Sequence, residues 1–242
     1  HKKHSLGAVN SINWARIVAQ IVYYFYAQLK FDEPCHFSVP TGNFGDVLAG
    51  WYAKQMGCPC KSLVVATNAN DILARFFATG TYSKPPSVVE TVTPSMDISV
   101  SSNFERFVYH CCGDDDTILK GLMDTFEATG AFTASPAHWE KCKAEMYAGS
   151  CQQPQILATI KKWHEKTDYV LDPHTAVGVY CAEQLKATLG PGPVVCLACA
   201  HWAKFPDANV SALGKEKAAS LVVPEPLASL HKLETRVSPQ VC

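Results

Sequence analysis

The segment from Pro40 to Asp46 places the tightest constraint on how this 242-residue chain can fold. It reads Pro-Thr-Gly-Asn-Phe-Gly-Asp and lies between an apolar run at 35–39 and a stretch of helical composition at 47–56. A strand that ends at Pro40 and continues as a helix near Asp46 would direct several backbone N–H groups, together with the positive end of the helix dipole, toward one point. The segment therefore predicts a cradle for an anion, and a phosphate group suits it.

Two glycines in this segment allow the backbone to approach a ligand closely. We expect a Cβ atom at Gly42 or Gly45 to collide with a bound anion, so a substitution at either glycine should be more damaging than one at a neighbouring side chain. Asn43 and Asp46 can turn the chain or cap the helix. Taken alone, the arrangement is a weak signal because ordinary connections between strands and helices share it.

Short β-rich runs alternate with helical segments along most of the chain. The runs are expected at 37–39, 63–66, 169–171 and 194–198. This alternation predicts an α/β fold with a mainly parallel sheet flanked by helices. A long helix at 12–29 has an apolar face that should lie against the sheet or a partner surface.

The middle of the chain has a different pattern. Helices are expected at 104–109, 115–129, 136–148 and 155–166, and strong strand signals are missing there. We therefore predict an α-rich insert at about 104–166.

Composition and charge exclude several classes of partner. Hydrophobic residues make up 48% of the chain, the formal net charge is -1, and charged residues are spread along the sequence. Without a basic stripe or a polybasic patch, binding to nucleic acid or to a membrane surface is not expected. No apolar stretch has the length of a bilayer span, and residues 1–4 are not followed by the apolar core of a signal peptide. We expect a soluble, cytoplasmic protein.

The eleven cysteines lie mostly in apolar runs. Free cysteine packs as a small hydrophobe, and a chain of this size without a secretory signal is expected to keep its thiols reduced. Cys196 and Cys199 have the spacing of a zinc or redox pair, but no second pair at ligand spacing accompanies them. We predict no metal site.

Six motifs follow one another along the chain. They lie at 10–16, 40–46, 66–71, 94–97 with 101–106, 172–178, and 200–205. In content and order they resemble the threonine synthase family, whose members are pyridoxal-phosphate (PLP) enzymes of the tryptophan-synthase-β-like fold. Several motifs in one order are far more specific than any one of them. The resemblance runs from about Ser11 to the final helices and implies the large domain of a fold type II PLP enzyme.

The resemblance also implies that part of the enzyme is missing. Members of this family carry their Schiff-base lysine in an N-terminal region, and residues 1–242 match the part of the catalytic domain downstream of it. We therefore expect this chain to be the C-terminal half, to be inactive alone, and to need the N-terminal half as a partner. Lys204 does not match the Schiff-base position, so no catalytic residue is assigned.

The resemblance assigns the PLP contacts to the glycine segment, namely Gly42, Asn43, Phe44, Gly45 and Asp46. It also places Cys199 where the family has a threonine against the pyridine nitrogen of PLP. A thiol is a weaker hydrogen-bond partner than a hydroxyl. Two readings stay open at this position: Cys199 meets the nitrogen, or it merely packs at a strand end while another group serves the nitrogen.

A second polar cluster precedes the helix at 12–29. Asn10, Ser11, Asn13 and Arg16 could receive a substrate carboxylate or phosphate, although the same spacing suits helix capping and a surface ion pair. His174 and His201 belong to family motifs near the cleft, and we assign them no proton transfer.

The reaction that the resemblance implies is the conversion of O-phospho-L-homoserine and water into L-threonine and phosphate. Other enzymes of the same fold, such as serine or threonine dehydratases and cysteine synthases, are the nearest rivals. A threonine-synthase-like phospho-lyase that acts on O-phospho-threonine is harder to exclude. A non-catalytic anion-binding module is the third hypothesis, and the cysteine at position 199 is its main support.

Overall fold

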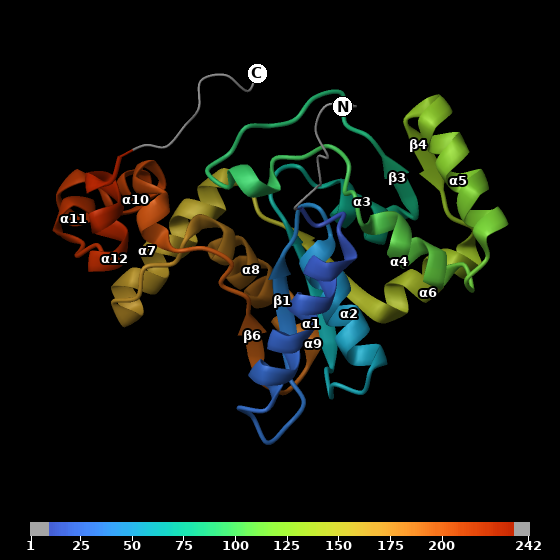
Figure 1. Ribbon diagram of the computed structural model, residues 1–242, viewed down its shortest axis with the longest axis horizontal. Coiled ribbons are helices and arrows are strands. Elements are labelled where there is room, and N and C mark those ends of the chain that lie inside the picture. Colours follow the sequence, from blue (N-terminus) through green and yellow to red (C-terminus); the bar gives the residue numbers. More distant parts are fainter. Residues whose placement is uncertain (1–9, 235–242) are drawn as a thin grey trace.

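The structure, a computed structural model, describes residues 10–234. Residues 1–4, which were considered above as the start of a signal peptide, and Cys242, the last of the eleven cysteines, lie outside this range. The centre is a four-stranded sheet in the order β5-β2-β1-β6, formed by Met146–Ser150, Ser62–Thr67, His36–Pro40 and Val194–Cys196 (Figure 1). All three pairings are parallel, and His36 lies opposite Ser62 on one side and Val194 on the other. The predicted mainly parallel sheet is confirmed.

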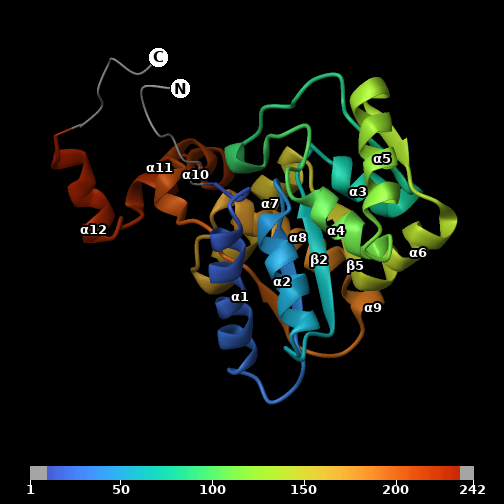
Figure 2. The same ribbon diagram turned by 45° about the vertical axis from the view of Figure 1, so that its right-hand side comes forward.

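Helices cover both faces of this sheet. On one face, α1 (Trp14–Gln28) and α2 (Gly45–Gln55) lie side by side, and α7 (Gln153–Thr167) and α8 (Pro173–Gln184) belong to the other face (Figure 2). Side chains alternate between two cores because successive residues of a strand point to opposite faces. Leu63 and Val65 pack with α1 and α2, whereas Val64 and Ala66 pack with α7 and α8. Burial of both faces explains the near-continuous apolar run of β2.

The segment that we expected to be an α-rich insert contains three helices beside the sheet. They are α4 (Phe104–Cys111), α5 (Asp116–Thr129) and α6 (Pro136–Glu145). A small antiparallel pair, β3 (Thr81–Ser83) and β4 (Ala131–Thr133), adjoins them. The same segment also supplies β5 and α7, which join the main sheet and its cover. That it forms a separate insert stays a prediction.

Two local expectations were wrong. The helix expected at 136–148 ends at Glu145, and Met146–Ser150 forms the edge strand β5. Nothing in the local sequence breaks the helix there, and pairing of Met146 with Leu63 of β2 selects the extended state. The run at 169–171, expected to be a strand, lies outside the strands of the described chain.

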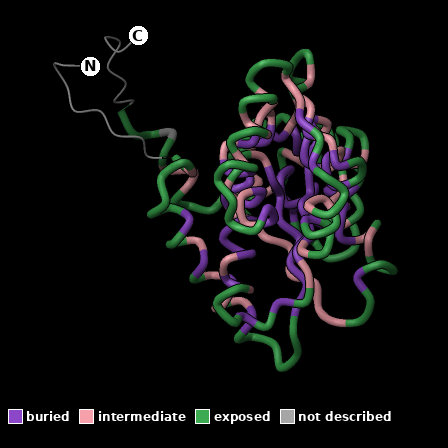
Figure 3. The backbone as a smooth tube through the Cα atoms, turned by 90° about the vertical axis from the view of Figure 1, so that its right-hand side faces the viewer, coloured by how far each residue is buried: buried purple, intermediate pink, exposed green. Residues whose placement is uncertain are grey.

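The remaining elements are short, and Figure 3 shows the buried residues gathered in the middle of the molecule with exposed residues around them. They are α3 (Ile72–Thr79), η1 (Pro94–Met96), α9 (Lys186–Leu189), η2 (Trp202–Lys204), α10 (Pro206–Leu213), α11 (Lys215–Ser220), α12 (Glu225–Ala228) and η3 (Ser229–Lys232). None of the helices within residues 10–234 has both the length and the apolar character needed to cross a membrane.

Candidate functional site

The predicted anion loop joins the carboxyl end of β1 to the start of α2. Its last residue, Phe44, has a left-handed backbone with φ 63°. A bulky residue adopts this conformation only where its surroundings hold it. Here the buried ring of Phe44 packs against Phe104 and Phe107, with ring centroids 5.2 Å and 5.5 Å away. The aromatic contacts therefore fix the turn from which α2 begins.

Hydrogen bonds divide the loop into two sides. The carbonyl of Gly42 accepts from Ser101 Oγ at 2.6 Å, and the carbonyl of Asn43 accepts from the backbone N of Asn103 at 3.1 Å. In contrast, no group within residues 10–234 accepts a hydrogen bond from the N–H groups of Gly42, Asn43, Phe44 or Gly45. The loop thus keeps four consecutive donors at the N-terminus of a helix, an arrangement that suits an anion.

The glycines of the loop are needed for a reason other than the expected one. An ideal Cβ on Gly42 would lie 2.9 Å from the Ser95 carbonyl oxygen, and one on Gly45 would lie 2.9 Å from Ser11 Cβ. The space that each glycine leaves is therefore filled by protein, and our expectation of a collision with the anion gave the wrong physical cause. Both positions still exclude larger residues, because the loop packs against η1 and the segment before α1.

A carboxylate in the first turn of α2 gathers three donors. Asp46 Oδ1 accepts from Tyr23 Oη at 2.5 Å and from Tyr24 Oη at 2.8 Å, and Cys199 Sγ lies 3.6 Å from Asp46 Oδ2. Burial raises the pKa of the Asp46 carboxyl, while the hydrogen bonds from the three donors lower it. Burial and the nearby Asp46 charge also raise the pKa of both tyrosines. The tyrosines therefore stay protonated and donate.

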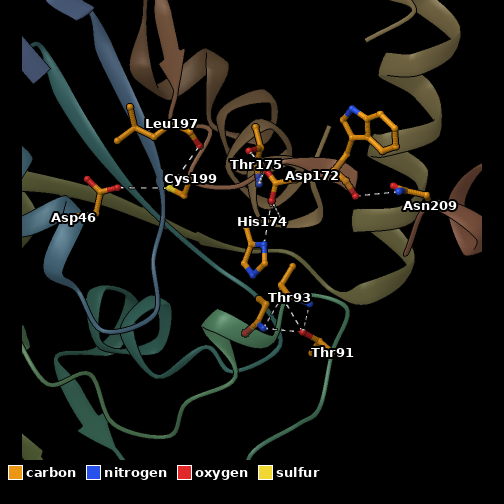
Figure 4. A network of polar contacts seen from close by, with 11 residues as sticks. Asp46, Thr91, Thr93, Asp172, His174, Thr175, Leu197, Cys199 and Asn209 are labelled. Carbon is orange, nitrogen blue, oxygen red and sulfur yellow. Dashed lines mark hydrogen bonds and ion pairs between the residues drawn. The ribbon is translucent and has the colours of Figure 1, made fainter. Parts of the chain in front are cut away.

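Cys199 lies just beyond β6 and is tied to the anion loop through this carboxylate (Figure 4). Burial, followed by the charge of Asp46, raises the pKa of the Cys199 thiol to about 12. The thiol is thus protonated at neutral pH and donates to Asp46. The residue as a whole is exposed, although protein atoms crowd the sulfur beside Asp46, and both readings of Cys199 stay open.

A buried polar network lies at the carboxyl end of β2. Asn68 Nδ2 donates to Thr91 Oγ1, Thr93 Oγ1 and Asp97 Oδ1 at 3.0, 2.9 and 2.7 Å. Asn70 Nδ2 lies 3.1 Å from the same Asp97 oxygen. The network holds the 89–97 segment over the sheet edge, where Ser95 meets Gly42.

A third cluster caps α8, as its Asp-Pro start predicts. Asp172 accepts from the backbone N–H groups of His174 and Thr175 at 2.9 and 3.3 Å, and also hydrogen-bonds both side chains. His174 Nδ1 lies 3.0 Å from Asp172, and its ring is directed toward Thr93 (Figure 4). Its buried Nε2 has no hydrogen-bond partner in the described part of the chain. The N-termini of α2 and α8 thus both bear polar groups.

Comparisons with known proteins give one consistent result. The family model "Threonine synthase, C-terminal" matches residues 175–240. The threonine synthase of Schizosaccharomyces pombe is 44% identical over 238 residues, which cover 86% of this chain and 46% of that protein. A solved structure of PLP-bound threonine synthase from Brucella melitensis is 44% identical, with a TM-score of 0.88, and the match covers 95% of this chain and 48% of that one.

This chain belongs to the threonine synthase family. It spans about half the length of the curated relatives that it matches, and it corresponds to their C-terminal half. A human family relative named threonine synthase-like 1 is less similar, at 35% identity over 217 residues covering 86% of this chain and 29% of that protein. The fold is that of the fold type II PLP enzymes.

In this threonine synthase family chain, the two predicted polar regions come together. Ser11 lies against Gly45 of the anion loop, so the segment before α1 adjoins the start of α2. Asn10 Oδ1 accepts from the Ile12 amide at 3.0 Å, and Asn13 Oδ1 caps α1 by accepting from the Ala15 amide at 3.0 Å. The capping role that we weighed for this cluster is therefore present at Asn13. The backbone N–H of Arg16 donates to the Asn13 carbonyl at 3.0 Å.

Several residues of the site were not assigned from the sequence. Arg106 joins the two regions, because its Nη1 donates to Asn103 Oδ1 at 2.8 Å and its Nη2 to the Ile12 carbonyl at 2.7 Å. Tyr23 and Tyr24 looked like ordinary apolar residues of a helix. Their only sequence signal was their place in a helix expected to be buried. His201, by contrast, caps the short helix η2, where its Nδ1 accepts from the Ala203 amide at 3.2 Å.

Proposed function

We propose that this chain is the cofactor-binding half of a threonine synthase, an enzyme that converts O-phospho-L-homoserine and water into L-threonine and phosphate. The four free amides of the anion loop carry the proposal, and membership of the family supports the reaction. Because the chain matches 46% of the Schizosaccharomyces pombe threonine synthase, the Schiff-base lysine would come from the N-terminal half, which is the proposed protein partner.

The donor set of the loop fits the phosphate group of pyridoxal 5'-phosphate. Backbone N–H groups at a helix N-terminus bind a phosphate through both hydrogen bonds and the helix dipole. We assign this role to Gly42, Asn43, Phe44 and Gly45. The Brucella melitensis relative is described as PLP-bound, which agrees with this assignment.

The groups around Asp46 would set the environment of the cofactor ring. When bound, PLP supplies an electron sink for the carbanions of the reaction. Tyr23 and Tyr24 hold the Asp46 carboxylate in place, and Asp46 orients the thiol proton of Cys199. With its proton directed at Asp46, the Cys199 sulfur would accept a hydrogen bond only from a protonated pyridine nitrogen, whereas an unprotonated nitrogen would need the thiol proton itself. Asp46 is thus a positioning residue for Cys199.

The segment before α1 would hold the substrate. Asn10, Ser11, Asn13 and Arg16 lie at the N-terminus of α1, next to the anion loop, where a phosphate or carboxylate of the substrate would meet donors of both side chains and backbone. Arg106 braces this segment through the Ile12 carbonyl. Two anion sites side by side match a reaction that brings a phosphorylated substrate to a phosphorylated cofactor.

A fused chimera tests the function directly. The N-terminal half of the Schizosaccharomyces pombe enzyme would be joined in frame to this chain, and phosphate release from O-phospho-L-homoserine would be measured with and without PLP. We expect PLP-dependent turnover by the chimera and none by the chain alone. A PLP-loaded, folded chimera that releases no phosphate from this substrate would refute the proposed reaction.

The same assay separates the remaining candidates. Faster release of phosphate from O-phospho-L-threonine would identify the phospho-lyase instead. A chimera that binds inorganic phosphate but not PLP would identify a non-catalytic anion-binding module. The ten cysteines of the described range are all free thiols, which agrees with the proposed cytoplasmic location.

A further inference from the structure

The carbonyl groups of the anion loop are held from one side by the start of α4. Ser101 Oγ donates to the Gly42 carbonyl at 2.6 Å. The Asn43 carbonyl accepts twice from Asn103, from its backbone N at 3.1 Å and from its Nδ2 at 3.0 Å. In a trans peptide, the C=O and the N–H that follows it point in opposite directions. The contacts therefore direct the N–H groups of Asn43 and Phe44 away from α4, so that an anion on the opposite side would meet both.

Arg106 decides which end of the Asn103 side chain faces the loop. A guanidinium group can only donate hydrogen bonds, so its Nη1, at 2.8 Å, selects the oxygen of the Asn103 amide. The amide nitrogen is then left to face the Asn43 carbonyl. Asn103 is buried, so solvent does not compete for its amide. The charge of Arg106 also polarises this chain of hydrogen bonds, which makes the Phe44 N–H a stronger donor.

The second arm of the same guanidinium group reaches residues 10–16, which we call the substrate segment. Nη2 of Arg106 donates to the Ile12 carbonyl at 2.7 Å. The N–H of the same peptide, that of Asn13, donates to the Asn10 carbonyl at 3.0 Å. Both ends of this peptide are therefore fixed, and the turn before α1 is anchored to α4. One side chain thus contacts both regions of the site, the substrate segment directly and the anion loop through its neighbour on α4.

We propose that Arg106 and Asn103 are positioning residues, which aim the amides of the anion loop at the phosphate of PLP and tie that loop to the substrate segment. The inference rests on the proposed function and names how its two anion sites are joined. Arg106 acts on the cofactor phosphate through Asn103 and on the substrate through the Ile12 carbonyl. Loss of Arg106 therefore weakens the binding of both, whereas loss of Asn103 weakens mainly that of the cofactor phosphate.

The test measures how tightly the fused chimera binds PLP and, separately, pyridoxal, which has the same ring but lacks the phosphate group. Arg106→Gln removes the two-armed contact. Arg75→Gln is the matched control, because Arg75 also holds one side chain and one backbone carbonyl, those of Asp71 and Ser83, at 2.9 Å each. Both arginines are partly exposed, so both variants should keep the fold.

We expect Arg106→Gln to raise the Kd for PLP about tenfold and to leave the Kd for pyridoxal unchanged, because only the phosphate meets the loop amides. Arg75→Gln should change neither value. Asn103→Ala should weaken PLP binding as Arg106→Gln does, and the double variant should be no weaker than either, since the two residues act in series. An unchanged Kd for PLP in Arg106→Gln, equal losses for PLP and pyridoxal, or additive effects in the double variant would each overturn the proposal. If Asn103→Ala fails to fold, the two titrations of Arg106→Gln decide alone.

The KM for O-phospho-L-homoserine, measured at saturating PLP, tests the arm that reaches the substrate segment. We expect Arg106→Gln to raise KM more than Asn103→Ala does, with a smaller change in kcat, and equal KM values would overturn the tie between the two regions. The PLP and pyridoxal titrations need no turnover. An inactive chimera with the expected titrations would therefore refute the proposed function and keep the positioning roles. An active chimera whose Arg106→Gln variant binds PLP as tightly as the unchanged chimera would keep the function and refute those roles.

Discussion

Gly42 shows how one missing side chain shapes the anion loop. We expect Gly42→Ala to lower the free energy of unfolding by roughly 1–3 kcal/mol, because its Cβ would press on the backbone oxygen of Ser95, which cannot move aside as a side chain could. Gly121→Ala is the control, since Gly121 lies exposed in α5 with open space around it. That change should instead raise the stability by up to about 1 kcal/mol, as alanine favours a helix. Urea denaturation of both variants measures the difference, and equal shifts would contradict it.

The reactivity of the Cys199 thiol tests its hydrogen bond to the Asp46 carboxylate. The thiolate is the reactive form, and the charge of Asp46 helps to raise the pKa of Cys199 to about 12. Asp46→Asn removes this charge, so the pKa should fall and more thiolate should exist at any mildly alkaline pH. Alkylation of Cys199 by iodoacetamide should therefore be faster in the variant, by about tenfold for each unit by which the pKa falls.

The half-buried Cys196 serves as the internal control for this experiment. Its pKa is raised by burial and by Glu183, and Asp46 is not among the causes. Peptide mass spectrometry can follow both thiols in one sample. An unchanged rate at Cys199, or an equal acceleration at both cysteines, would show that Asp46 does not hold the Cys199 proton.

At the scale of elements, the side-chain amides of Asn68 and Asn70 hold the 89–97 segment, and Asn68 reaches three of its side chains. Asn68→Ala removes the amide that contacts Thr91, Thr93 and Asp97, and it takes a donor from the buried Thr93 hydroxyl. We expect a loss of roughly 2–4 kcal/mol in unfolding free energy and faster proteolysis within 84–97. Lys120→Ala breaks an exposed ion pair with Asp124 and should leave the free energy of unfolding nearly unchanged. Protection of the 84–97 segment in the Asn68 variant would show that other contacts hold it.

The elements that sequence predicted well are those with local signals. Asp172 followed by a proline marks the start of α8, and the glycine segment marks the passage from β1 to α2, because caps and turns are made by neighbours in sequence. β5 was missed because its strand state comes from pairing with β2, more than seventy-five residues earlier. Arg106 was missed for the same reason, since the carbonyl of Ile12 that it contacts is distant in the chain.

At the scale of the whole molecule, alternation of β-rich and helical runs was enough to predict a parallel sheet with covered faces. It could not predict the order of the strands, which decides that β6 is an edge. The candidate site shows the same limit. The loop at 42–46 was read from composition and motif, whereas its junction with Cys199, Tyr23 and Tyr24 is formed by three segments that meet only in the folded chain.

The ring of Phe44 packs against Phe104 and Phe107, and this packing affects how tightly and how fast the loop binds an anion. A turn residue that is 1% exposed leaves the loop few alternative conformations. Little conformational entropy is then lost when an anion arrives, so most of the interaction with the four amides is retained as affinity. Encounter with the anion should accordingly proceed without a slow rearrangement of the loop, and association should be governed by diffusion and charge.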